Sequence, residues 1–161
     1  MLVRVLDICP ETVAKLFAVY DESMADMREN FGDEQEMHDA YAEFLQGFVS
    51  EQTQLVLVEE VDGRWVSALR AIATSPDKWF LEAVETVPEL RGKGYGKLLL
   101  KDSVAYLERL GAKTVECNIA DNNSISMKLH SACGFAPTKD APVNCWNELE
   151  EGCILFRRNI A

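Results

Sequence analysis

The residues with the clearest chemical potential lie in one short segment that combines glycines with cations. It reads Arg91, Gly92, Lys93, Gly94, Tyr95, Gly96 and Lys97. The glycines let backbone N–H groups approach a ligand closely, because no Cβ intervenes. A helical apolar pattern begins at Tyr95, so these N–H groups coincide with the positive end of a helix. Four cations and no acid fall within residues 91–101, and the segment therefore predicts a site for a phosphate-bearing ligand.

Two familiar phosphate motifs do not fit this segment. Walker A requires GxxxxGK followed by Ser or Thr, and the segment has neither the spacing nor the hydroxyl. A dinucleotide fingerprint requires GxGxxG with an acid about 20 residues further on, whereas the glycines here alternate at 92, 94 and 96. The phosphate ligand is therefore expected to be of another kind.

The segment instead resembles the acetyl-CoA-binding motif of the GNAT superfamily of N-acetyltransferases. That motif, RxxGxG or QxxGxG after a strand ending in Val and Pro, is filled by Arg91, Gly94 and Gly96. Further along, the chain reads NSISMKLHSACGF, which is similar to the second pattern of that family. The matching positions are Asn123, Ser126, His130, Gly134 and Phe135. Two patterns in the expected order make the resemblance specific. It is strong over residues 80–135 and extends over essentially the rest of the chain by the pattern of elements alone.

Hydrophobic periodicity predicts the elements that must position these residues. Strands are expected at 2–6, 54–60, 64–72, 80–87, 114–119 and 153–157, and helices over 10–27, 34–49, 95–110 and 123–133. Asp62 and Gly63 predict a tight antiparallel hairpin, and residues 136–151 fit either a loop or a short helix. With 161 residues and 48% hydrophobic content, the chain suits a single domain, 1–161. The resemblance implies an α/β (α+β) fold, a mixed, mostly antiparallel twisted sheet with helices on both faces.

The resemblance also implies a reaction in which a neutral amine attacks the thioester carbonyl of acetyl-CoA and CoA thiolate departs, without a metal. An N–H near Thr86 or Val87 would stabilise the oxyanion, and Asn123 and Ser126 would lie near the cofactor. Pyrophosphate would bind the N–H groups of residues 92–97, with the neighbouring cations close by. The alternative for those cations is ordinary surface charge.

Proton transfer needs further groups, because amines are protonated at neutral pH. Glu82 and Glu85, on the expected central strand, are the candidate bases, and three-residue spacing points them to opposite faces unless a bulge intervenes. Relatives often carry a Tyr acid where this chain has His130. A charged imidazole could protonate the thiolate. The alternatives are that each glutamate only pairs with a cation and that His130 only bonds a backbone carbonyl.

Composition limits the remaining possibilities. The net charge of −11 and pI near 4.6 argue against nucleic-acid binding. No apolar run approaches the ~20 residues of a membrane span, and no secretory leader is recognised, so a cytoplasmic location is expected. Nine acids against one cation in residues 21–43 form either a solvated face or a rim that attracts a cationic amine. Five scattered cysteines and two distant histidines suggest no metal site.

Three interpretations follow. The first is an acetyl-CoA-dependent N-acetyltransferase acting on a small or peptide amine, and the second is an acyl-CoA-binding sensor or structural member of the same fold. The third is a nucleotide-dependent kinase or dehydrogenase. The sequence leaves open the amine itself, the choice between monomer and homodimer, and the role of residues 136–151.

Overall fold

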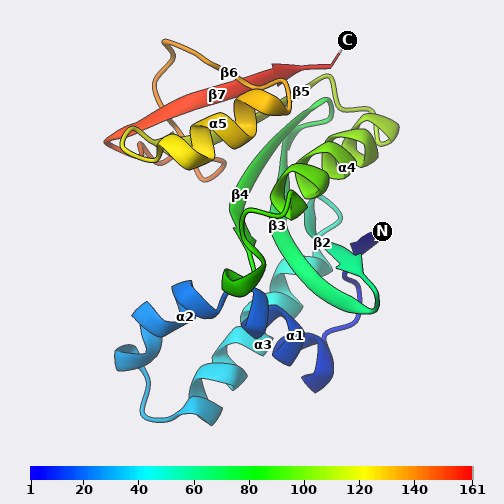
Figure 1. The fold of residues 1–161 in the computed structure, drawn as a ribbon, viewed down its shortest axis with the longest axis vertical. Helices are drawn as coiled ribbons and strands as arrows, with labels where there is room; N and C mark the ends of the chain where they lie inside the picture. Colours follow the sequence, from blue (N-terminus) through cyan, green and yellow to red (C-terminus); the bar gives the residue numbers. More distant parts are fainter. Residues whose placement is uncertain (161) are drawn as a thin grey trace.

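The computed structural model describes residues 1–160, which form one seven-stranded sheet with helices on both faces (Figure 1). The strands are β1 (Leu2–Arg4), β2 (Gln54–Val61), β3 (Arg64–Ser75), β4 (Lys78–Thr86), β5 (Thr114–Ala120), β6 (Ala136–Pro137) and β7 (Cys153–Asn159). The helices are α1 (Pro10–Val19), α2 (Asp21–Met27), α3 (Glu34–Ser50), α4 (Tyr95–Arg109) and α5 (Ser124–Ala132), with 3-10 turns at Arg28–Asn30 and Pro88–Leu90. No helix in residues 1–160 is long and apolar enough to cross a membrane.

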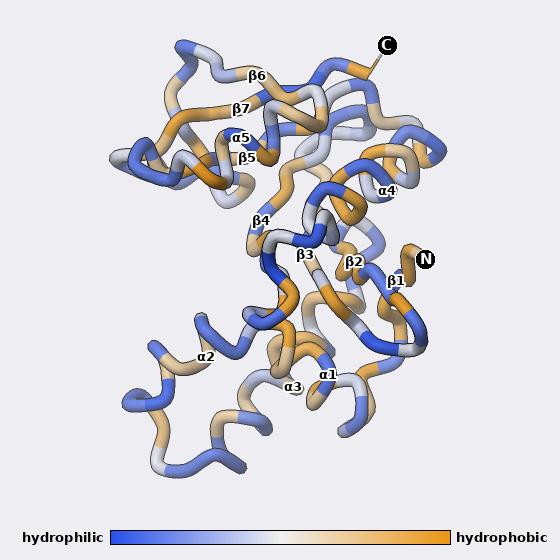
Figure 2. The backbone as a smooth tube through the Cα atoms, viewed as in Figure 1, coloured by the Kyte–Doolittle hydropathy of each residue, from blue (hydrophilic) through white to orange (hydrophobic). Residues whose placement is uncertain are grey.

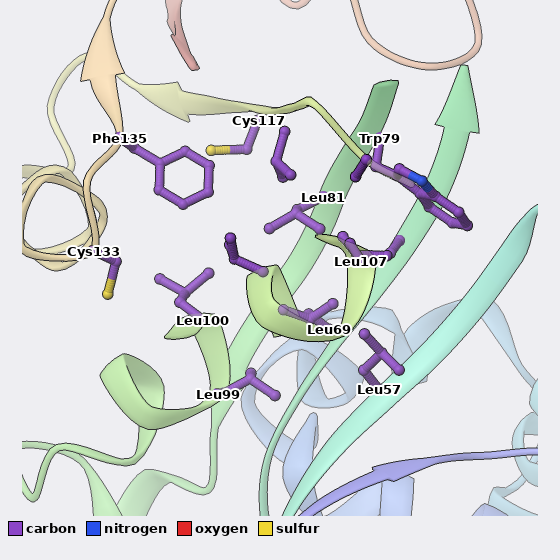
Figure 3. Packing of buried hydrophobic residues seen from close by; sticks show 14 of the residues in the cluster. Leu57, Leu69, Trp79, Leu81, Leu99, Leu100, Leu107, Cys117, Cys133 and Phe135 are labelled. Carbon is purple, nitrogen blue, oxygen red and sulfur yellow. The ribbon is translucent and has the colours of Figure 1, made fainter. Parts of the chain in front are cut away.

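The sheet order is β1-β2-β3-β4-β5-β7-β6, and every neighbouring pair is antiparallel except β4 with β5. Nearly continuous apolar runs, such as residues 55–58 of β2, place side chains on both faces of the central strands, so both faces are buried. Leu57 and Leu69 pack against α4, whereas Val56 and Ala68 pack against α1 to α3. Figure 3 shows the first of these cores, in which α4 lies over the sheet. The expected fold, a mixed and mostly antiparallel sheet between two helical layers, is confirmed.

β4 and β5 are neighbours along only part of their length. The parallel register joins Lys78 to Thr114, Trp79 to Val115 and Phe80 to Glu116, and the strands then diverge. Figure 1 shows them running apart from this shared end. Beyond Phe80, in the part of the chain that the structure describes, the β5-facing edge of β4 has no strand partner. Backbone groups there are open to a ligand.

A bulge in β4 lies beside this opening. On β3, Ala68 and Arg70 are two residues apart, but their partners on β4, Glu85 and Glu82, are three apart. The extra residue is accommodated at Ala83, whose φ of 54° lies in the left-handed region. Because residues directly opposite one another share a face, Glu82 and Glu85 lie on the same face of the sheet, the face covered by α1 to α3.

The observed elements differ from the predicted ones mainly at two places. The helix expected over 10–27 is two helices, since α1 ends at Val19 and α2 begins at Asp21. The ambiguous segment 136–151 is a short strand followed by a loop with one isolated bridge, Val143 to Leu149. Figure 2 shows that hydrophilic residues predominate along α2 and the turn that leads to α3, which agrees with their position on the outside of the molecule.

Candidate active site

The glycine-rich segment forms the turn between β4 and α4. Gly94 is the N-cap residue of α4 with φ of 87°, a left-handed conformation in which any side chain is strained. Gly96 lies so close to α5 that a Cβ on it would meet Leu129 Cδ2 at 3.2 Å and Thr86 Oγ1 at 3.5 Å. The first turn of α4 contains no acid, so its N–H groups keep their positive potential.

A cavity of about 520 Å³ lies over this turn and helix start. Its lining comes from α2, the end of β4, the turn, the start of α4, and α5 with its N-cap: Glu22, Val84, Glu85, Thr86, Leu90, Arg91, Gly92, Gly94, Tyr95, Gly96, Lys97, Asn123, Ile125, Ser126 and Leu129. We call it the cofactor cavity. Glycine amides, a helix N-terminus and a lysine are groups that hold a pyrophosphate, so the residues present fit the phosphate end of a coenzyme A molecule.

The predicted cations take different positions. Lys97 lines the cofactor cavity, whereas Lys93 is exposed and does not line it. Arg91 lines the cavity but is already paired, because its Nη1 donates to Glu22 Oε2 at 2.6 Å. Glu22 on α2 is therefore an anion beside the expected phosphate position. No signal beyond the acidic composition of residues 21–43 predicted it.

The two residues expected near the thioester carbonyl, Thr86 and Val87, lie in different surroundings. Thr86 lines the cofactor cavity, and its Oγ1 lies 3.0 Å from Ser67 Oγ. Val87 is buried beneath α1 to α3, and its N–H donates to the Val66 carbonyl at 2.9 Å. The structure thus leaves no free Val87 N–H for a ligand, while the open edge of β4 before Thr86 keeps unpaired backbone groups.

A smaller cavity of about 150 Å³ fills the gap where β4 and β5 diverge. Asn123, Ser126 and His130 line it from α5, and Asn123 caps that helix by accepting from the Ser126 N–H at 3.1 Å. An elongated ligand that begins at the α4 turn can continue into this gap, because Val84, Asn123 and Ser126 belong to both cavities.

His130 is 2% exposed and packs edge-on against Phe135. Its Nδ1 lies 2.8 Å from the Ser126 carbonyl oxygen, which can only accept, so Nδ1 carries the proton and donates. Burial lowers the pKa of the His130 imidazole below its ordinary value of 6.5, and the bond to Ser126 offsets this only in part. These contacts favour a neutral ring with an unprotonated Nε2, which is buried without a hydrogen-bond partner.

A third cavity, of about 620 Å³, lies on the other side of β4, between that strand and α1 to α3. Its lining is mostly apolar: Tyr20, Ser23, Met24, Met27, Phe31, Met37, Ala40, Tyr41, Phe44, Arg70, Ala83, Val84 and Glu85. We call it the acceptor cavity. It meets the cofactor cavity at Val84 and Glu85, the two residues common to both linings.

Glu85 is the acid at this junction. Its Oε1 accepts from Ser23 Oγ, and its Oε2 is buried without a partner. Burial raises the pKa of the Glu85 carboxyl above its ordinary value of 4.5, while the hydrogen bond from Ser23 and the charge of Arg91 act in the opposite direction. A half-buried carboxylate with a raised pKa and a free oxygen is suited to accept a proton.

Glu82 lies on the same face but is committed to another partner. Arg70 Nε donates to Glu82 Oε1 at 3.0 Å, and the Arg70 guanidinium stacks 5.2 Å from the ring centre of Phe44. The bulge thus brings both candidate carboxylates toward one side of β4. Of these two carboxylates, Glu82 is paired with Arg70, whereas Glu85 forms no ion pair and lines both large cavities.

The arrangement was then compared with known proteins. A family model described as the acetyltransferase (GNAT) family matches residues 16–135. The chain belongs to the GNAT family. The matched residues include both sequence patterns, the glycine-rich one at 91–97 and the one that begins at Asn123. A search of curated protein sequences gave no match.

Solved structures agree on the GNAT fold. The PaiA N-acetyltransferase of Thermoplasma acidophilum, in complex with coenzyme A, has a TM-score of 0.72 at 15% identity, with 99% of each chain covered. The ribosomal-protein-alanine N-acetyltransferase of Brucella melitensis has a TM-score of 0.69 at 18% identity, also with 99% of each chain covered. A spermidine N-acetyltransferase SpeG chimera from Vibrio cholerae and hSSAT has a TM-score of 0.74 at 14% identity, covering 99% of this chain and 94% of that one.

Several residues of the site were not found from the sequence. Arg70, Tyr20 and Ser23 line the acceptor cavity, and Tyr20 Oη donates to the Ala83 carbonyl at 2.8 Å, which holds the bulge against α1. A lone arginine inside the apolar strand around Leu69 was an available signal. Tyr20 and Ser23 carry no such signal, because their role depends on where α1 and α2 cross β4.

Proposed function

We propose that this GNAT protein is an acetyl-CoA-dependent N-acetyltransferase that transfers the acetyl group to a primary amine within a ternary complex. One observation carries the proposal: Val84 and Glu85 line both the cofactor cavity and the acceptor cavity. A thioester carbonyl held on one side of the bulge and an amine held on the other would meet there. Such positioning is a large part of the rate enhancement in group transfer.

The chain's own residues supply the binding of acetyl-CoA in this proposal. Gly92, Gly94 and Gly96 would present backbone N–H groups to the pyrophosphate at the start of α4, with Lys97 beside it. The unpartnered edge of β4 would bond the amides of the pantetheine arm, and an N–H before Thr86 would face the carbonyl oxygen. Acetyl-CoA supplies the activated acetyl group, and no metal is required.

Glu85 would accept the proton that the acceptor ammonium must lose before attack. The carboxylate form is the active base, so turnover is expected to rise with pH as Glu85 ionises. Because burial raises the pKa of Glu85 above its ordinary value of 4.5, this rise is expected at a higher pH than for an exposed glutamate. Glu82 would act through its ion pair by fixing Arg70 in the cavity wall.

His130 would take no charge in the reaction. Its buried Nδ1–H bond to Ser126 supports a positioning role at the start of α5, and thiolate is a good enough leaving group to depart without an acid. This role also agrees with the second interpretation, an acyl-CoA sensor without catalysis, so the function has to be tested by reaction.

The test is acetyl-CoA consumption against a panel of primary amines with detection of free thiol. Amine-dependent thiol release is expected. Binding of acetyl-CoA with no release for any amine would favour the sensor and would contradict the proposal. Stabilisation by ATP or NAD that exceeds stabilisation by coenzyme A would favour the nucleotide enzyme instead.

The base is tested with Glu85→Gln, which keeps the side-chain shape and the Ser23 contact. We expect turnover to fall by ~10² to 10⁴ and the rising limb of the pH–rate profile to disappear. Glu108→Gln is the control, because Glu108 is exposed on α4 and lines none of the cavities described above. Near-normal turnover in folded Glu85→Gln would assign the proton to water or to Glu82.

A further inference from the structure

The acceptor cavity has a composition that restricts the amine it can receive. We propose that the acceptor is a primary amine whose remainder is uncharged and apolar, such as an alkylamine or arylalkylamine. A polyamine, an amino acid or a peptide would fit less well. The proposal rests on the acetyl transfer proposed above and concerns only the chemistry of the acceptor.

The walls of this cavity are apolar and come from α2, α3 and the turn between them. They are formed by Met24, Met27, Phe31, Met37, Tyr41 and Phe44. Met37 is 2% exposed, which shows that the wall continues directly into the core between the sheet and α1 to α3. Methionine side chains adapt to ligands of different shape, and aromatic rings add large contact areas. An apolar tail would therefore be stabilised along these walls.

The charged residues of the lining can pair with one ammonium group only. Its charged residues are Arg70 and Glu85. Arg70 is neutralised by Glu82 and lies over the rings of Phe44 and Phe48, at 5.2 and 5.9 Å from their centres. This leaves Glu85 as the single uncompensated charge, located at the junction with the cofactor cavity. The ammonium would lie at Glu85 and the rest of the molecule would extend toward the methionine and aromatic walls.

Extra charges on the acceptor would be unfavourable for different reasons. A second ammonium at the far end of a polyamine would be removed from water among apolar side chains, with no second carboxylate in the lining to pair with it. A carboxylate next to the amine would approach Glu85 and Glu82 and would have to compete with Glu82 for Arg70. The acids of residues 21–43 lie mostly on the exposed surface, where they can attract any cation but do not select its tail.

The experiment compares amines that differ by one group, using kcat/KM from thiol release. Hexylamine is expected to exceed 1,6-diaminohexane by at least about tenfold, and phenethylamine to exceed phenylalanine by at least about tenfold, since an unpaired charge would be buried in each second member. From butylamine to hexylamine, kcat/KM is expected to rise roughly fourfold per methylene.

A variant locates the selectivity in this cavity. Met27→Glu introduces a carboxylate into the wall at a residue that is 46% exposed, so the fold should tolerate it. We expect the hexylamine to diaminohexane ratio to fall about tenfold or more. Leu6→Glu is the control, because Leu6 is 67% exposed and does not line the cavity. It should leave the ratio unchanged.

The outcomes separate this proposal from the one on which it rests. Preference for the diamine, for phenylalanine or for a short peptide would overturn the apolar acceptor while acetyl transfer stands. An unchanged ratio in folded Met27→Glu would overturn the assignment of selectivity to these walls. Acetyl-CoA binding without thiol release for any amine would overturn the proposed function, and this inference with it.

Discussion

Glu85 is a half-buried titratable group and His130 is a buried one, and their surroundings give them opposite uses. The Glu85 carboxyl keeps one oxygen without a partner beside two cavities, whereas the His130 ring donates to a carbonyl one turn back in its own helix. Burial disfavours the charged form of each group, so it raises the pKa of Glu85 and lowers that of His130. A raised carboxyl pKa makes a better base, while a lowered imidazole pKa makes a poorer supply of imidazolium.

The neutral state of His130 has a measurable effect on stability. Because the folded pKa lies below the unfolded value of 6.5, the unfolded chain binds more protons between these two values. The contribution of His130 is therefore fully present above about pH 6.5 and is lost as pH falls through the folded pKa, with a slope of at most about 1.4 kcal/mol per pH unit. His130→Gln should remove this slope from the free energy of unfolding, measured with urea between pH 7 and 5.

The control for this prediction is His38→Gln, which removes the other histidine of the chain and should retain the slope. If His130→Gln instead leaves the pH dependence of stability intact but abolishes a falling limb in turnover at high pH, imidazolium is the acid after all. The two variants thus separate a structural histidine from a catalytic one.

At the residue scale, the sequence predicted positions held by the main chain better than those set by side-chain contacts. Gly94 and Gly96 are recognisable because a left-handed cap and a close helix approach restrict the residue type. The Arg91 pairing with Glu22 was not predictable, because the two residues are 69 positions apart and meet only through the placement of α2. Lys97 lines the cofactor cavity and Lys93 does not, for the same reason: the turn fixes the backbone of the lysines but not their side chains.

At the scale of elements, the bulge in β4 has the largest effect on the site. Three-residue spacing predicted that Glu82 and Glu85 face opposite sides, with a bulge as the exception, and the exception holds at Ala83. An alanine at positive φ carries no sequence signal. The strands and α4 could be predicted from their apolar residues, because strands buried on both faces carry continuous apolar runs and α4 carries an apolar stripe of helical period.

The turn before α4 gives a prediction with a matched control. Gly94 and Gly111 both have positive φ, and a Cβ on either would meet nothing within 4 Å. Alanine at each position should therefore cost a similar ~1–2 kcal/mol of stability. Only Gly94→Ala should weaken acetyl-CoA binding, by about tenfold or more, because Gly94 lines the cofactor cavity and Gly111 does not. Titration calorimetry would measure both affinities, and equal values would remove the phosphate site from this turn.

At the scale of the whole molecule, the gap between β4 and β5 lies between two parts of the sheet, and the cofactor cavity adjoins this gap. One part contains four strands, β1 to β4, and the other contains β5, β7 and β6. A ligand that contacts both parts binds the folded state alone.

Acetyl-CoA at 100 times its Kd should then add about 2.7 kcal/mol of stability. For a chain of 161 residues this corresponds to a rise in Tm of about 5–10 °C in thermal denaturation. ATP and NAD at the same concentration should raise Tm less, and an equal rise would contradict the coenzyme A assignment.

The short junction between β4 and β5 also determines which amides of β4 a neighbouring strand protects. Three residue pairs join the two parts of the sheet. Beyond Phe80, the β5-facing amides of β4 have no strand partner within residues 1–160 to protect them. Such amides exchange with solvent deuterium without global unfolding, whereas amides in the paired interior of β2 and β3 exchange only with it. The two strands are thus joined at Lys78 and separated toward Glu85. Deuterium uptake along residues 81–85, measured with and without coenzyme A, would report how far a bound cofactor protects this open edge of β4.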